Sequence, residues 1–106
     1  MLLESAGCDV RVCHDGPAAL EVARTFGPDV CVIDLLMPGM CGEELAVQLR
    51  KQAGDRPIRC VALTGLWDIN THHRTHNLGF AEHLVKPVEP ERLIEAVYGH
   101  RLAGMA

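Results

Sequence analysis

Asp34, Thr64 and Lys86 each stand directly after a short run of mainly apolar residues. A carboxylate can attack a phosphorus atom and hold the phosphoryl group as an aspartyl phosphate. A lysine ammonium neutralises phosphate oxygens as a point charge, and a threonine hydroxyl donates a hydrogen bond to them. Phosphoryl transfer depends mainly on positioning and charge stabilisation, so these three residue types form a coherent set for that chemistry.

Each of the three residues also has an ordinary structural explanation. An Asp after a strand commonly forms a turn or caps a helix, and a Thr there commonly bonds to nearby backbone. A Lys before Pro is usually solvated. Their occurrence after three successive apolar runs favours the functional interpretation, provided that those runs are neighbouring strands.

The surrounding sequence predicts such strands, because short apolar runs alternate with amphipathic segments of helical length. The run from Val30 to Ile33 is apolar at every position, which is typical of a strand covered on both faces. Gly16-Pro17 begins a helix and Gly27-Pro28 ends it. The pattern predicts strands over 9–13, 30–33, 58–63 and 83–85, and helices over 16–26, 43–52, 68–78 and from residue 90 onward.

This β-α-β-α-β-α-β-α order predicts an α/β domain with an open, doubly wound parallel sheet. Functional groups of such sheets gather beyond the carboxyl ends of the strands. Asp34, Thr64 and Lys86 are therefore expected to lie together at one edge of the sheet.

Composition restricts the classes of function. The 106 residues suit one domain, and a net charge of -4 without a basic run argues against nucleic-acid binding. No apolar stretch approaches the ~20 residues of a membrane-spanning helix, and a signal peptide is not recognised, so we expect a cytoplasmic protein. The five cysteines include no Cys-x-x-Cys pair and are interpreted mainly as reduced, small hydrophobic residues.

Three segments resemble the receiver domains of two-component response regulators: 32–42 (Val-Ile-Asp-Leu-Leu-Met-Pro-Gly-Met-Cys-Gly), 62–65 (Ala-Leu-Thr-Gly) and 84–87 (Leu-Val-Lys-Pro). The resemblance extends from Met1 to about Gly99. It implies a flavodoxin-like fold and a signalling module rather than an enzyme. It also implies a phosphorelay in which a sensor histidine kinase or a histidine phosphotransfer protein supplies the phosphoryl group. The amino-acid sequence over 79–88 is most similar to that of receivers fused to hybrid sensor histidine kinases.

The resemblance also implies a role for individual residues. Asp34 would accept the phosphoryl group, Thr64 and Lys86 would contact it, and the backbone carbonyl of Leu36 would join Asp34 in binding Mg²⁺. Pro38, Gly42 and Pro87 would shape the loops around the site. His83 occupies the position of the family's switch residue, often Tyr or Phe, although an ordinary strand-end histidine is an equal alternative.

One departure from the family concerns the metal. Receivers begin with a strand that ends in two adjacent acidic residues, and no such pair occurs here, because Met1 to Gly7 resembles the end of the first helix. We therefore expect residues 1–106 to be a single receiver domain that lacks its first strand and most of its first helix. Weak or absent Mg²⁺ binding and impaired phosphorylation would follow. The chain is then either a fragment of a longer receiver or a degenerate receiver that binds partners without phosphate.

Two rivals from other classes fit less well. An aspartyl-phosphate hydrolase needs a second Asp two residues after the nucleophile, where this chain has Leu36. A metal-binding module could use His72, His73 and His76, but no further ligand at suitable spacing completes it. For a phosphate-independent interaction domain, the expected partner surface is roughly 66–98, with the polar helix near 68–78 as its mobile part. The sequence leaves the oligomeric state open.

Overall fold

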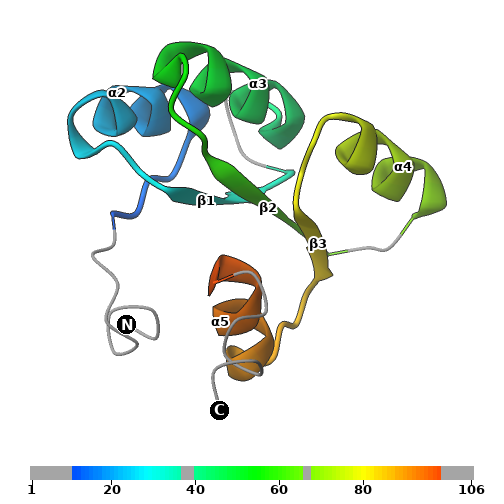
Figure 1. The fold of residues 1–106 in the computed structure, drawn as a ribbon. Helices are drawn as coiled ribbons and strands as arrows, with labels where there is room; N and C mark the ends of the chain where they lie inside the picture. Colours follow the sequence, from blue (N-terminus) through cyan, green and yellow to red (C-terminus); the bar gives the residue numbers. More distant parts are fainter. Residues whose placement is uncertain (1–10, 37–39, 66–67, 99–106) are drawn as a thin grey trace.

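A computed structural model describes residues 11–36, 40–65 and 68–98 of the chain. The elements are, in chain order, α2 (Gly16–Phe26), β1 (Val30–Asp34), α3 (Gly42–Ala53), β2 (Arg59–Thr64), α4 (Ile69–Asn77), β3 (Glu82–Val85) and α5 (Pro90–Tyr98) (Figure 1). Each of these elements overlaps the strand or helix predicted for it, with boundaries that differ by at most one residue. None of the helices in these segments has the length and apolar character needed to cross a membrane.

The three strands form one parallel sheet in the order β1-β2-β3. In Figure 1, α2 and α3 lie over one face of the sheet, α5 covers the other face, and α4 lies beside β3. Helices therefore cover both faces, which confirms the predicted α/β doubly wound fold. This arrangement explains why the strands are apolar at consecutive positions and do not alternate with polar residues.

The predicted strand over 9–13 is wrong for its described part. Residues 11–13 are not a strand, and the side chain of Val12 is 60% exposed. Alternating polar and apolar residues stabilise a strand only where a neighbouring strand satisfies its backbone groups, and the three-stranded sheet pairs with none of 11–13. The predicted helix end at 1–7 lies outside the described residues.

Local capping interactions fix the limits of α2. The side chain of Asp15 accepts a hydrogen bond from the backbone N–H of Ala18 at 2.7 Å, and Pro17 occupies the first turn, where its missing N–H costs no hydrogen bond. Gly27 ends the helix with a φ of 63°, and its N–H donates to the carbonyl of Ala23 at 3.0 Å. Because this left-handed conformation favours glycine, the sequence locates the end of α2 correctly.

The four described cysteines, Cys13, Cys31, Cys41 and Cys60, carry free thiols. Cys31 and Cys60 are direct partners across β1 and β2, and burial raises the pKa of the Cys31 thiol to about 12. These thiols are therefore neutral packing groups, as the sequence predicts. Cys41 has a different role, because its Sγ caps α3 by accepting from the N–H of Glu44 at 3.4 Å.

Two apolar clusters on opposite faces of the sheet form the core. The larger cluster joins the sheet to α2 and α3 and contains the buried residues Ile33, Leu35, Leu45, Ala46, Leu49, Cys60, Ala62 and Phe80. The smaller one, under α5, contains Val61, Leu84 and Ala96. Neighbouring residues of β2, such as Val61 and Ala62, thus belong to opposite clusters, as the pleat of a strand requires.

Two aliphatic residues of α3 test this core. Leu45 is 1% exposed, so Leu45→Ala should lower the free energy of unfolding by about 2–5 kcal/mol through lost burial and a residual cavity. Val47 is 40% exposed, and Val47→Ala should change it by about 0.5 kcal/mol or less. Urea denaturation, monitored by circular dichroism, measures the free energy of unfolding of both variants. Equal effects of the two substitutions would contradict the placement of α3.

Candidate functional site

The three residues proposed for phosphoryl chemistry lie at the carboxyl edge of the sheet. Asp34 is the last residue of β1, Thr64 is the last residue of β2, and Lys86 directly follows β3. The parallel register brings these positions level, because Asp34 pairs with Leu63, and the N–H of Lys86 donates to the carbonyl of Thr64 at 2.7 Å. The structure thus brings together residues that are far apart in the sequence.

Lys86 and Asp34 are in direct contact. The Nζ of Lys86 lies 2.5 Å from Oδ2 of Asp34, although the two residues extend from strands on opposite sides of β2. Strands are separated by about 4.8 Å, so the lysine and aspartate side chains together span roughly 10 Å of sheet. The side chain of Lys86 is 46% exposed and that of Asp34 is 38% exposed, so this ion pair adds little to the stability of the fold. Its main effect is on the protonation of Asp34.

Asp34 is held as a carboxylate. The hydrogen bond from Lys86 is the main cause that lowers the pKa of Asp34, and a hydrogen bond from the backbone N–H of Leu36 lowers it further. The Leu36 bond to Oδ1 is 2.9 Å long, so each carboxylate oxygen has a donor. An ionised, accessible carboxylate is the form that can act as a nucleophile.

The loop after β1 packs closely because Gly42 has no side chain. A Cβ at Gly42 would lie 2.8 Å from the carbonyl oxygen of Asp34 and 2.8 Å from the Cα of Leu35. The N–H of Gly42 also donates to the carbonyl of Leu35 at 3.4 Å. Gly42 therefore lets α3 begin directly against the end of β1. The other residue predicted to shape this loop, Pro38, lies outside the described residues.

The remaining two predicted positions differ in their surroundings. Pro87 follows Lys86 through a cis peptide bond, which lies in the turn after β3. His83 is not at the carboxyl edge but on β3, where its Nδ1 lies 3.3 Å from Oγ1 of Thr75 and its ring stacks on His72, with centroids 5.6 Å apart. No sequence signal marks Thr75 as the partner of His83, because the burial of a threonine in a polar helix depends on how α4 packs against β3.

The described residues do not by themselves fit a Mg²⁺ site. Magnesium requires near-octahedral oxygen ligation, and Asp34, the one carboxylate that ends a strand of the described sheet, already accepts a hydrogen bond at each oxygen. Across the described segments, no three His, Cys, Asp or Glu side chains converge to hold an ion. This finding also argues against a metal module built on His72, His73 and His76. Metal ligation by the Leu36 carbonyl stays a prediction.

Comparison with known proteins identifies the class. The family model of the response regulator receiver domain matches residues 1–98, and the chain belongs to that family. It is 35% identical over 91 residues to the probable transcriptional regulator ycf27 of Porphyridium aerugineum, covering 86% of this chain and 37% of that protein. It is 30% identical over 97 residues to the DNA-binding response regulator MtrA of Mycolicibacterium paratuberculosis, covering 92% and 42%. The chain thus spans about two fifths of the length of these relatives.

Solved structures agree with this assignment. The chemotaxis protein CheY4 of Vibrio cholerae is 29% identical, with a TM-score of 0.82 and coverage of 92% of this chain and 82% of that one. A response regulator from Burkholderia pseudomallei, solved with a phosphorylated aspartic acid, a calcium ion and citrate, is 27% identical with a TM-score of 0.79. That alignment covers 98% of this chain and 62% of the other. The chain is a receiver domain of two-component signal transduction.

Removing the Lys86 ammonium tests the electrostatics of the site. In Lys86→Met the pKa of Asp34 should rise toward its ordinary value of 3.8, and the N–H of Leu36 should keep part of the depression. Because the folded-state pKa is depressed, the Asp34 contribution to stability is present above pH 3.8 and is lost as pH falls through the folded pKa. Carboxyl carbon NMR titration measures the shift, and Lys51→Met at an exposed position of α3 is the control. An unchanged Asp34 titration in Lys86→Met would contradict the contact.

Gly42→Ala tests the close approach of α3 to β1. The added methyl group meets backbone atoms at 2.8 Å, so the helix must move, which costs about 1–3 kcal/mol and exceeds any gain in helix propensity. Gly65→Ala is the matched control, since nothing lies within 4 Å of its Cβ position. Thermal denaturation should show a lower midpoint for Gly42→Ala alone. Similar midpoints for the two variants would exclude a steric role for Gly42.

Proposed function

We propose that Asp34 is the phosphoacceptor of this receiver and that a histidine kinase or a histidine phosphotransfer protein is the donor. The observation that carries the proposal is the 2.5 Å contact between Lys86 Nζ and Asp34 Oδ2. It places a cation beside an ionised carboxylate at the edge where doubly wound sheets bind their ligands. The buried residue Thr64 ends the strand that lies between the two.

In the proposed reaction, an oxygen of Asp34 attacks the phosphorus of a phosphohistidine. The new O–P bond forms as the N–P bond breaks, and the electron pair of that bond remains on the imidazole nitrogen. Lys86 then redirects its ammonium from the carboxylate to the phosphoryl oxygens, whose charge is larger. The Thr64 hydroxyl donates a hydrogen bond to the same group. Attack needs no removal of a proton, because the depressed pKa keeps Asp34 ionised at neutral pH.

A second candidate is a receiver that binds its partner without phosphorylation. The residues at the site favour it, since Asp34 is the only carboxylate that ends a strand of the described sheet, and no three potential metal ligands converge among the described residues. Phosphoryl transfer relies on divalent cations to neutralise developing charge, so a weak metal site would slow it. On this alternative, the Lys86–Asp34 pair is a constitutive contact, and the partner surface is the region of α4, β3 and α5.

Intact mass spectrometry after incubation with acetyl phosphate and Mg²⁺ separates the two candidates. We expect one added phosphoryl group on the unmodified chain, at a rate lowered by the weak metal site, and none on Asp34→Asn. Asp29→Asn is the matched control, because Asp29 is a strongly exposed carboxylate just before β1 and should not affect labelling. Lys86→Met should reduce the labelling rate at least tenfold through lost charge stabilisation.

A second arm replaces acetyl phosphate by a phosphorylated histidine phosphotransfer protein. No phosphoryl group from either donor, with the fold intact by circular dichroism, would overturn the phosphoacceptor proposal and favour the phosphate-independent receiver. Labelling that persists in Asp34→Asn would assign the acceptor to another residue.

A further inference from the structure

The contact between α4 and β3 contains a cluster of histidines with no place in phosphoryl transfer. A small cavity of about 60 Å³ lies between these elements, and its lining includes His72, Thr75, His76 and His83. The Nε2 atom of His83 is buried there without a hydrogen-bond partner in the structure. A buried nitrogen of this kind is uncommon in folded proteins, because leaving it unpaired costs free energy.

The contacts of Thr75 determine where the proton of His83 lies. The Thr75 hydroxyl donates its single hydrogen to the carbonyl of His72 at 3.0 Å. At its 3.3 Å contact with Nδ1 of His83 it must therefore be the acceptor, so Nδ1 carries the hydrogen. Nε2 of the neutral ring is then the lone-pair nitrogen, and it is the atom that would take up a second proton.

Protonation of Nε2 is unfavourable while α4 is docked. The new N–H would be buried without an acceptor, and the positive ring would lie parallel to His72, at an interplanar angle of 19° and a centroid distance of 5.6 Å. Burial and then the neighbouring His72 both lower the pKa of His83. The docked state therefore prefers the neutral ring.

Four elements supply the other titratable or charged groups around His83, and most of these groups have partners of their own. On α4, His76 lines the same cavity, and Arg74 pairs with Glu43 of α3 at 3.0 Å. On β3, Glu82 pairs with Arg92 of α5 at 2.6 Å and with Arg59 of β2 at 3.5 Å. From α3, Arg50 donates to the carbonyls of Leu78 and Gly79, and the nearby thiol of Cys60 on β2 is kept neutral by burial.

Helix α4 is also weakly embedded. Thr75 is its one buried residue, whereas α3 buries four and α5 buries two. A helix held mainly by polar contacts can open locally without unfolding of the core. Loss of the contact between Thr75 and His83 would therefore remove much of the interaction that holds α4 against β3.

We propose that His72, Thr75 and His83 form a proton-sensitive latch that docks α4 on β3 at neutral pH and releases it as the pH falls. The open state takes up a proton on His83 that the docked state disfavours. Docking is therefore complete above the ordinary histidine value of 6.5 and weakens as pH falls from 6.5 toward the lower pKa of docked His83, by up to tenfold per pH unit. The latch does not depend on whether Asp34 accepts a phosphoryl group.

The test is hydrogen exchange of the α4 amides by NMR between pH 8 and pH 5, with rates corrected for the intrinsic pH dependence. In the unmodified chain, the opening constant of α4 should be flat from pH 8 to pH 7 and should rise at least fivefold by pH 5.5. In His83→Phe, which keeps a ring but cannot be protonated, the rise should be absent. His73→Asn is the matched control, because His73 is an exposed histidine of the same helix and its loss should leave the rise intact.

A second variant tests the latch if His83→Phe does not fold. His72→Asn removes the neighbouring imidazole, so the imidazole carbon resonance of His83 should titrate at a higher pH than in the unmodified chain, and α4 opening should follow that titration. An opening constant that stays flat to pH 5 in the unmodified chain, or an equal rise in His83→Phe, would overturn the proposal. So would titration of His83 at or above 6.5.

Discussion

The in-register parallel pairing of β1, β2 and β3 is the constraint on which the site depends. Asp34 pairs with Leu63, and Thr64 pairs with Val85, so the three strands end at nearly the same level. A slip of one residue would turn every side chain to the opposite face and would carry Ile33 out of the larger cluster. The apolar clusters on both faces therefore fix the positions of Asp34, Thr64 and Lys86, although none of these three residues contributes apolar area to those clusters.

The site itself adds charge control rather than stability. Lys86 and Asp34 remain partly exposed, so their attraction is screened by water, yet it is strong enough to lower the pKa of the carboxyl group. The stability that holds them in place comes from buried residues behind them, such as Leu45 and Ala46 of α3. Gly42 joins these two parts, because the absence of its Cβ lets α3 start against the backbone of Asp34.

Helices α5 and α4 are attached to the sheet in different ways. Helix α5 is attached through buried Ala96 and Val97, and the Arg59 guanidinium also donates to the carbonyl of Ala96 at 2.8 Å. Helix α4, at the outer side of β3, is held by an ion pair, arginine contacts to its carboxyl end and the histidine cluster. Polar contacts respond to pH and charge far more than apolar burial does, so the attachment of α4 is more sensitive to these conditions than the attachment of α5.

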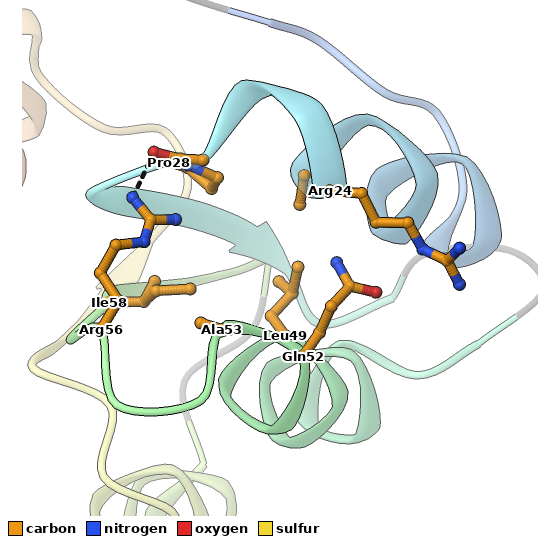
Figure 2. A pocket seen from close by; sticks show the side chains of 9 residues that line it. Arg24, Pro28, Leu49, Gln52, Ala53, Arg56 and Ile58 are labelled. Atoms are coloured by element: carbon orange, nitrogen blue, oxygen red, sulfur yellow. Dashed lines mark hydrogen bonds between the residues drawn. The ribbon is translucent and has the colours of Figure 1, made fainter.

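A second cavity, of about 230 Å³, lies at the opposite end of the sheet between the ends of α2 and α3. Figure 2 shows Leu49 and Gln52 of α3 directed toward α2, while Arg56 reaches the carbonyl of Gly27, to which it donates at 2.6 Å. Arg56 thereby satisfies a carbonyl at the carboxyl end of α2, where a positive charge is favourable. This role of Arg56 depends on how the ends of α2 and α3 approach each other, so no local sequence pattern indicates it.

The sequence by itself determined the class of fold, the order of the elements and the three residues at the carboxyl edge. Those features follow from local signals: apolar runs, capping residues such as Asp15 and Gly27, and the position of polar residues after strands. The alternating residues 9–13 show the limit of such signals, because a strand exists only when another strand pairs with it, and 11–13 have no such partner in the described sheet. A local sequence pattern does not contain information about whether such a partner strand is present.

Only the tertiary structure decided the contacts between elements that are distant in the chain. The reach of Lys86 across β2 to Asp34, and the placement of His83 against His72 and Thr75, depend on strand order and on where α4 docks. Burial, proton position and pKa are properties of those surroundings, so the same residue types in another arrangement would have different chemistry. The sequence therefore identified which groups are available, and the fold decided which of them meet.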